Sequence, residues 1–192
     1  RATPDASRLD TQLYINPITY SVTDDDTRRL TKPDRAPGFA LSFNSCRPYS
    51  AGSVYIKSAD AAMPPAIHGN YLDDQRDIED VLRMARFIGR MQNSPSVQKL
   101  LAAPPETNLL ALSDNEIIDD FRARSGTVFH PCGTCRMGPD RRHSVVDPQL
   151  RVHGVGKLRV ADAAIFPNIT SANTNAPTIA VAHKAADLIL QS

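Results

Sequence analysis

The sequence predicts an α+β fold in which a mostly antiparallel β-sheet is backed by helices. Residues 12–60 carry β-branched and aromatic residues between clusters of Pro, Gly and Asp, a pattern typical of strands and turns. Residues 74–91 and 113–126 then show helical patterns, and a last helical run follows Pro177. No internal repeat or low-complexity linker interrupts this order.

Strands are predicted over residues 12–22, 37–48 and 53–60. The last of these alternates cleanly, with Val54 and Ile56 on the same face. The Pro-rich residues 61–72 predict a short edge strand, because Pro cannot donate to a central ladder. We expect core positions, rather than a pocket wall, for the strand aromatics Tyr14, Phe39 and Phe43.

Helices are predicted over residues 74–91 and 97–101, the second ended by Pro104 and Pro105. Ser113 and Glu116 have the spacing of a capping box, which starts a third helix that Gly126 is expected to close. One apolar stripe on the first helix is formed by Ile78, Val81, Leu82, Ala85, Ile88 and Met91.

The C-terminal third begins differently. Residues 145–167 contain two short apolar runs that resemble strands and are split by a Gly turn. Pro177 is well placed in the first turn of a helix that would continue to residue 190.

Composition excludes several functional classes. The 192 residues carry a net charge of +1, with isolated arginine pairs, so nucleic acid is not an expected partner. No apolar run approaches the ~18 residues of a membrane span. The N-terminus lacks a signal peptide's apolar stretch, although the chain opens without Met and is expected to be a fragment. Three cysteines, an odd number, favour a reducing, cytoplasmic location.

The stretch GTVFHPCGTCRMGPD (126–140) places His130 beside a C-x-x-C pair, and three interpretations compete. His130, Cys132, Cys135 and His143 would be a zinc site, but structural zinc sites use paired knuckles with a longer connection. A thioredoxin-type pair needs a helix N-terminus, which Gly138 and Pro139 forbid. In the third interpretation, His130 stands at the end of a strand over residues 127–129 and transfers protons.

Four sequence blocks favour the third interpretation. They are H-P-x-G-T-x-R-M-G (130–138), V-V-D-P-x-L-R-V-H-G-V (145–155), L-R-V-A-D-A-A-I-F-P (158–167) and A-N-T-N-A-P-T (172–178). In this order they resemble the C-terminal signature of the glucose–methanol–choline (GMC) flavoprotein oxidoreductases. Arg47-Pro48 with Gly52-Ser53-Val54, the Ser58–Asp60 turn and Asn70–Leu72 resemble the family's substrate domain.

The resemblance implies the domain organisation and the cofactor. Residues 1–126 would form the substrate-binding domain, and residues 127–192 the catalytic loop and a tail that completes a missing flavin-binding domain. The fold would be that of the C-terminal domain of FAD-linked reductases. The family's G-x-G-x-x-G fingerprint for FAD is not found among the nine glycines of this chain. FAD would therefore need the N-terminal FAD-binding region as a partner, and this chain alone would not retain it.

The resemblance also implies site residues. His130 would be the general base toward an alcohol, and Asn173 would hydrogen-bond the substrate oxygen. Asp162 and Ala163 match the position near the ribityl and phosphate groups, where Ala164 replaces the Ser that is common in the family. The helix start at residues 173–178 would face the flavin's pyrimidine side. The implied cofactor contacts are Asp162, Ala163, Asn173, Thr174, Asn175 and Thr178.

The implied reaction is oxidation of a primary alcohol, choline-like or aromatic, by hydride transfer to FAD. Two alternatives remain: a hydroxynitrile-lyase-type relative that keeps FAD, and a small metal-binding or interaction domain around His130 and the two cysteines. For the alcohol oxidoreductase and for the lyase-type relative we expect no metal, and Cys132 and Cys135 would then only pack a tight turn. The remaining histidines are expected at surface or helix positions: His68, His143, His153 and His183.

Overall fold

The computed structural model describes residue 7, residues 9–22 and residues 30–191. The chain divides into two compact units, each described separately below. The first comprises residues 1–45 and 74–127, as far as they are described, and the second comprises residues 46–73 and 128–192. One boundary lies within a residue of the predicted division at 126/127, but residues 46–73 group with the C-terminal unit. The functions assigned to the two predicted ranges stay predictions.

The described strands form three separate two-stranded sheets. In the first unit, β1 (Thr11–Asn16) pairs with β4 (Ala40–Ser45), and β2 (Tyr20–Val22) pairs with β3 (Leu30–Pro33). In the second unit, β5 (Ser53–Tyr55) pairs with β6 (Ala66–His68). Every pairing is antiparallel.

The antiparallel α+β class is therefore confirmed, but a single larger sheet is not present among the described residues. The predicted strand over residues 12–22 is two strands, because the chain bends at Pro17 between them. The strand predicted over residues 53–60 ends at Tyr55, and the Pro-rich segment supplies its partner β6, as predicted.

The helices of the first unit begin at identifiable caps. Helix α1 (Gln75–Gln92) starts after Asp74, whose carboxylate accepts from the Arg76 N–H. Ser94 caps the short α2 (Pro95–Gln98), which begins two residues before the prediction. Helix α3 (Asp114–Arg124) has the predicted capping box, with the Ser113 N–H donating to Glu116 at 2.7 Å. It ends at Ser125 in extended conformation, and Gly126 does not adopt the left-handed conformation of a glycine cap.

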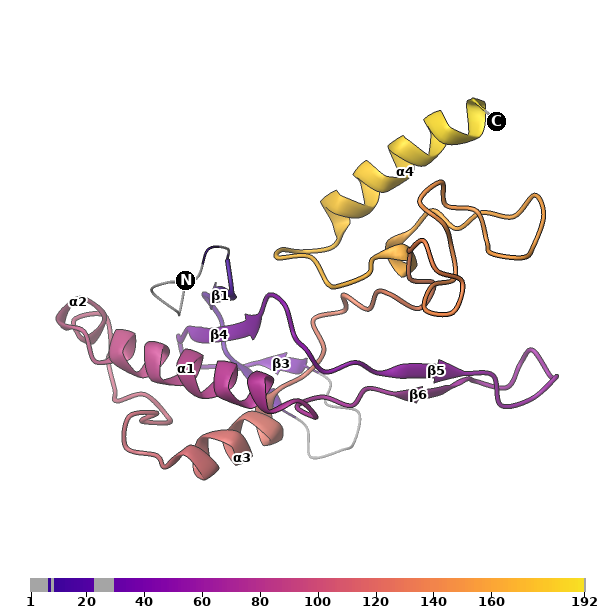
Figure 1. Cartoon of the computed structure of the whole chain (residues 1–192). Helices are drawn as coiled ribbons and strands as arrows, with labels where there is room; N and C mark the ends of the chain where they lie inside the picture. Colours follow the sequence, from indigo (N-terminus) through magenta and orange to yellow (C-terminus); the bar gives the residue numbers. More distant parts are fainter. Residues whose placement is uncertain (1–6, 8, 23–29, 192) are drawn as a thin grey trace. The chain divides into compact units, whose positions relative to one another are not determined.

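The core of the first unit lies between α1, α3 and the β1–β4 pair, which lie side by side in Figure 1. Phe43 on β4 stacks on Phe121 of α3, with ring centroids 5.7 Å apart, so this strand aromatic is a core residue as predicted. The buried side chains at the centre are Ala85, Ile88, Leu109 and Ile117.

The second unit contains little regular structure besides α4 (Asn175–Leu190), the 3-10 turn η1 (Ala163–Ile165) and the β5–β6 hairpin. The two strand-like runs predicted in 145–167 are wrong: residues 145–162 form turns joined by isolated bridges, such as Val146 with Val152. These runs are apolar because their side chains fill a core under α4. That core consists of Val146, Leu150, Ile165, Phe166 and Ala185.

Within the described part of the chain, none of the helices combines the length and the apolar character needed to cross a membrane.

Candidate active site

His130 lies in a loop whose backbone is unusual directly before the histidine. The prediction that residues 127–129 end a strand is wrong, since they are irregular. Phe129 has a left-handed backbone (φ +58°), although it is not glycine, and its side chain is 82% exposed. Left-handed backbone is disfavoured by Cβ crowding, so the surrounding loop must hold Phe129 in place. The half-buried imidazole follows directly at this bend.

The loop after His130 is fixed by backbone hydrogen bonds to η1 and its flanks. The amides of Gly133, Cys135 and Met137 donate to the carbonyls of residues 163, 164 and 165 at 3.3, 2.9 and 2.8 Å. Gly133 is required here, because its φ is +83° and a Cβ would lie 3.1 Å from a carbonyl oxygen.

Two of the residues predicted to contact FAD take part in this arrangement. Asp162 is exposed, and its carboxylate caps η1 by accepting from the Ala164 N–H at 2.7 Å. The carbonyl of Ala163 accepts from Gly133. Both residues therefore help to hold the His130 loop, and their contacts with a cofactor stay a prediction.

The start of α4 meets the histidine. Thr174 Oγ1 lies 3.1 Å from His130 Nδ1, a hydrogen bond that joins residues 44 positions apart. Thr174 is the N-cap of α4 and is buried, whereas the flanking Asn173 and Asn175 are exposed. The helix begins two residues before the predicted start, so Pro177 lies in its first turn, as predicted. The structure thus brings the predicted base next to the segment that contains Asn173.

Thr178, the last of the predicted cofactor contacts, lies one turn into α4. Its hydroxyl donates to the carbonyl of Thr174 at 2.7 Å, alongside its amide at 3.0 Å. This doubled contact fixes the backbone of Thr174 against the helix.

The two cysteines show neither predicted alternative chemistry. Both are half-buried free thiols, and Cys132 packs against the core of the second unit. Burial raises the pKa of the Cys132 thiol, against the opposing influence of Arg136. A redox-active cysteine needs the reverse shift, usually at a helix N-terminus, and residues 131–162 contain no helix. Packing a tight turn is the role that fits.

The proposed zinc ligands do not converge. Across residues 7, 9–22 and 30–191, no group of three or more His, Cys, Asp or Glu side chains is arranged to hold a metal ion. His130 Nδ1 is engaged by Thr174, and His143 Nδ1 lies 2.7 Å from Asp140 Oδ2. The backbone N–H of Arg142 and the ring of His143 both hydrogen-bond to Asp140 and lower its pKa.

A second histidine, His153, holds the turn that follows the His130 loop. Its Nε2 lies 3.1 Å from the Gly138 carbonyl and 3.1 Å from Ser144 Oγ. Because a carbonyl only accepts, Nε2 carries the proton, and Ser144 donates to the Asp140 carbonyl at 2.6 Å. His153 is therefore a half-buried structural residue rather than the surface residue predicted. His143 and His68 are exposed, as predicted, and His183 lies within α4, as predicted.

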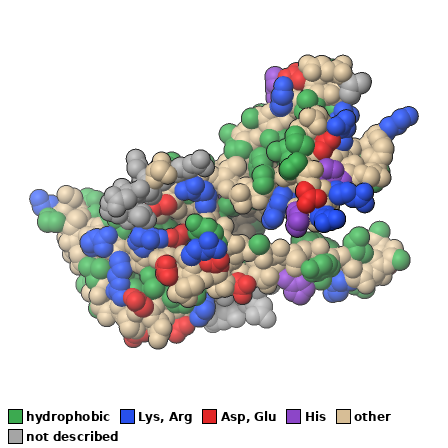
Figure 2. Space-filling model, in the orientation of Figure 1, with side chains coloured by type: hydrophobic (Ala, Val, Ile, Leu, Met, Phe, Trp, Pro, Cys, Tyr) green, Lys and Arg blue, Asp and Glu red, His purple; other side chains and the backbone are tan. Residues whose placement is uncertain are grey.

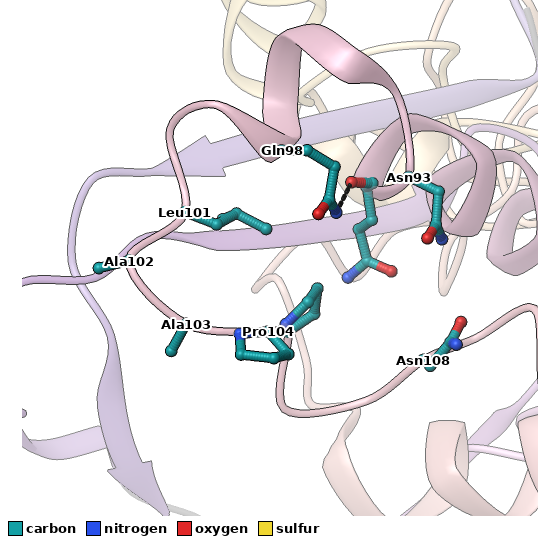
Figure 3. A pocket seen from close by; sticks show the side chains of 9 residues that line it. Asn93, Gln98, Leu101, Ala102, Ala103, Pro104 and Asn108 are labelled. Atoms are coloured by element: carbon teal, nitrogen blue, oxygen red, sulfur yellow. Dashed lines mark hydrogen bonds between the residues drawn. The ribbon is translucent and has the colours of Figure 1, made fainter.

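A pocket in the first unit is a poor candidate for catalysis. Its volume is about 390 Å³ and it lies between the end of α1 and the Pro104 loop (Figure 3). Four amide side chains line it, together with alanines, prolines and Leu101, and none of the lining side chains is titratable. One of these amides, Gln98, is already used in donating to the Gln92 carbonyl at 2.7 Å. Acid–base chemistry has no group to use here.

The outer side of α4 is apolar and exposed. Ile179, Ile189 and Leu190 are 61%, 49% and 85% exposed. Figure 2 shows hydrophobic side chains on the face of this helix that is in view. Side chains on the other side, Val181, Ala185 and Leu188, fill the core of the unit. α4 therefore carries exposed apolar side chains in addition to those on its core side, and it also exposes His183 and Lys184.

Comparison with known proteins shows the family. The sequence matches the family model for GMC oxidoreductases over residues 48–182. This match spans most of the chain, so the chain belongs to the GMC oxidoreductase family.

Three individual proteins show how similar the relatives are to this chain. The chain is 37% identical over its whole length to an alcohol dehydrogenase (acceptor) of Pseudomonas putida, of which it covers 33%. It is 39% identical over 79% of its length to an oxygen-dependent choline dehydrogenase of Klebsiella pneumoniae, covering 27% of that protein. A formate oxidase from Aspergillus oryzae, an FAD protein, matches 83% of this chain with a TM-score of 0.74 and 32% identity, over 28% of its own chain. The chain thus spans about a third of the length of these relatives or less.

Sequence reasoning missed the bond between Thr174 and His130. The resemblance gave Thr174 only a cofactor contact. A signal was present, because the Pro at position 177 removes the N–H that a helix-capping Thr174 would normally bind. No comparable signal marks the left-handed backbone of Phe129.

Proposed function

We propose that this chain is the substrate-facing part of an FAD-dependent alcohol oxidoreductase that converts a primary alcohol to an aldehyde, with His130 as general base. The observation that carries the proposal is the hydrogen bond between His130 and Thr174. It joins the H-P-x-G-T block to the A-N-T-N-A-P-T block, so that two short motifs far apart in sequence form one site.

His130 suits proton removal from a hydroxyl group. A neutral imidazole accepts a proton at ordinary pH, and taking the hydroxyl proton leaves charge on the substrate oxygen, which favours departure of the hydride on the adjacent carbon. Bound FAD would supply the acceptor for this hydride, at its N5 position. The alcohol then loses one proton to His130 and one hydride, which leaves the aldehyde.

Asn173 has a complementary role in the proposal. An amide cannot act as a base, but its NH2 group donates hydrogen bonds to an alkoxide oxygen. Asn173 is exposed and directly precedes the residue that contacts His130. It would orient the substrate oxygen while His130 holds the proton.

In the proposal, the start of α4 would face the edge of the flavin ring. Asn175 and Ala176 are its first residues, and the N–H groups of a first turn have no partners within the helix. The first turn carries no acidic residue, so its partial positive charge is not offset there. These groups, with Asn173, Thr174 and Thr178, would hold one edge of FAD. The remaining contacts, including the pyrophosphate site, would come from the FAD-binding part of the protein, which would also cover the apolar outer side of α4.

We take the substrate to be a small primary alcohol, choline-like or aromatic. The alcohol and choline dehydrogenases that the chain resembles support this substrate class.

His130→Ala in the full-length, FAD-loaded enzyme tests the proposal. Loss of a general base should lower turnover by roughly 10²–10⁴-fold. The matched control is His143→Ala, which removes an exposed imidazole from the same unit and should leave turnover unchanged. Unchanged turnover in His130→Ala would remove His130 from the mechanism.

A second measurement separates oxidoreductase from lyase chemistry. Mixing the wild-type enzyme with a primary alcohol without oxygen should bleach the flavin absorbance. A hydroxynitrile lyase would leave the flavin oxidised, and that result would rule out the proposed reaction.

A further inference from the structure

The hydroxyl of Thr174 is committed to His130 rather than to its own helix. Thr174 is only 8% exposed, and its Oγ1 lies 3.1 Å from His130 Nδ1. A Thr at the N-cap normally accepts from the backbone N–H two or three residues on. Thr174 makes no such bond.

One feature of the sequence and one of the backbone explain why Thr174 makes no capping bond. The residue three positions on is Pro177, which has no N–H to donate. Thr174 itself has a helical backbone (φ −73°, ψ −13°) instead of the extended backbone of a capping residue. Thr178 fixes this backbone by donating to the Thr174 carbonyl through both its amide and its hydroxyl.

The direction of the bond determines which nitrogen of His130 can act. If Nδ1–H donates to Thr174 Oγ1, Nε2 keeps its lone pair and can take a proton. If the hydroxyl donates to Nδ1 instead, the proton of the neutral ring is on Nε2, and the ring has no nitrogen left to act as a base.

We propose that Thr174 is a positioning residue that accepts from His130 Nδ1–H and so holds the imidazole in the tautomer whose Nε2 is unprotonated. This inference rests on the proposed role of His130 as the base. When Nε2 takes the substrate proton, the ring becomes cationic and the same Nδ1–H bond becomes charge-assisted and stronger. Thr174 would therefore orient the ring before the reaction and stabilise its charged form during it.

The tautomer is measured directly by nitrogen NMR of the chain labelled with 15N-histidine, at a pH where the ring is neutral. His130→Gln assigns the signal among the five histidines. The wild-type ring should show a protonated Nδ1 and an unprotonated Nε2. The opposite tautomer in the wild type would overturn the inference, even if His130 proves to be the base. Since this measurement does not involve turnover, it also decides the inference if the proposed function fails.

Variants of Thr174 test the consequence for turnover in the full-length, FAD-loaded enzyme. Thr174→Val keeps the shape but removes the acceptor, and kcat should fall by roughly 3–10-fold, with KM nearly unchanged, because the lost bond is stronger to the charged ring than to the neutral ring. The Nδ1–H tautomer should lose its dominance. Thr174→Ser restores the hydroxyl and should restore both readouts.

Thr170→Val is the matched control, because the Thr170 hydroxyl donates to the Ala172 carbonyl in the same loop and not to His130. It should change neither the tautomer nor kcat. A Thr174→Val enzyme with wild-type tautomer and wild-type kcat would overturn the inference, as would a Ser variant that folds but behaves like Val.

Discussion

The two units of this chain build their cores in different ways. In the first unit, two capped helices pack against an antiparallel strand pair, and regular elements supply nearly all of the buried side chains. In the second unit, one helix covers turns that are joined by isolated bridges and by backbone bonds such as Met137 N–H to the Ile165 carbonyl. The first unit thus packs regular elements whose helices begin at local sequence signals, whereas the second unit depends mainly on bonds between segments that are irregular on their own.

The candidate site lies in the irregular unit. His130 and Thr174 both stand where regular structure is absent or just beginning, and each is held by bonds to a distant part of the chain. Loops fixed on a scaffold can present side chains in directions that a helix or strand cannot offer. The left-handed backbone of Phe129, directly before His130, is a conformation that neither a helix nor a strand provides.

Removing core volume should have the largest effect on stability. Ile165 is 2% exposed at the centre of the second core, so Ile165→Ala should cost about 2–5 kcal/mol in the free energy of unfolding. Hydrogen exchange should show lost protection in residues 133–137, whose amides bond to this segment. Urea denaturation gives the magnitude.

Ile189→Ala is the matched control, because Ile189 is 49% exposed and its truncation should change stability by no more than about 0.5 kcal/mol in this chain. Equal losses in both variants would mean that the second core is not packed as described. Ile117→Ala, in the first core, should instead reduce protection in α1 and α3.

The same contrast explains what the sequence could predict. The first unit's helices follow from periodicity and from caps such as Ser113 with Glu116, which are signals within a few residues. The runs in 145–167 look like strands, because the pattern of apolar side chains does not distinguish a strand from a turn that faces a core. Their actual partners, such as Met137 for Val146, are fixed only by the folded backbone.

The candidate site likewise contains residues that the sequence identified and a contact that it did not predict. The four motif blocks identified His130 and Asn173 through their resemblance to the family, and nothing in the structure tests those roles. The bond between His130 and Thr174 spans 44 positions, and although Pro177 removes a usual capping partner of Thr174, no local pattern identifies His130 as the residue that its hydroxyl contacts.

Removing a helix cap should have the next largest effect on stability. The N-caps of α3 and α4 allow the two units to be compared directly. Ser113→Ala removes the two bonds of the Ser113 hydroxyl, one accepted from the Glu116 N–H and one donated to the Glu116 carboxylate, and should cost about 1 kcal/mol in unfolding free energy. Ser113→Asp keeps a capping oxygen and should recover most of the loss. Thr174→Val takes no capping bond from α4, so circular dichroism should show unchanged helix content. A loss of helix in that variant would contradict the assignment of its hydroxyl to His130.

The backbone at Phe129 offers a smaller effect of opposite sign. Glycine adopts a left-handed backbone without Cβ crowding, and the Phe129 side chain is 82% exposed, so Phe129→Gly should stabilise the chain by about 0.5–1 kcal/mol. The neighbouring Val128 has no left-handed backbone, and Val128→Gly should destabilise by a similar amount. Thermal unfolding of both variants measures the difference. Destabilisation by both glycines would show that the Phe129 backbone is not strained.

The acid response of the first unit should be the smallest effect, because its main contributor is an ion pair near the surface. Side-chain and backbone hydrogen bonds from Arg76 lower the pKa of Asp74 from its ordinary value of 3.8 to about 2. The folded chain therefore binds fewer protons than the unfolded chain between these values, so this stabilisation is complete above about pH 4 and is lost as the pH falls toward about 2. Asp74→Asn keeps a capping oxygen but cannot titrate, so its urea midpoint should fall less than that of the wild type over this range. Hydrogen exchange in the first turn of α1 should report the change, since Asp74 caps that turn. Identical acid responses of the two proteins would show that the Arg76 contacts do not hold Asp74 ionised.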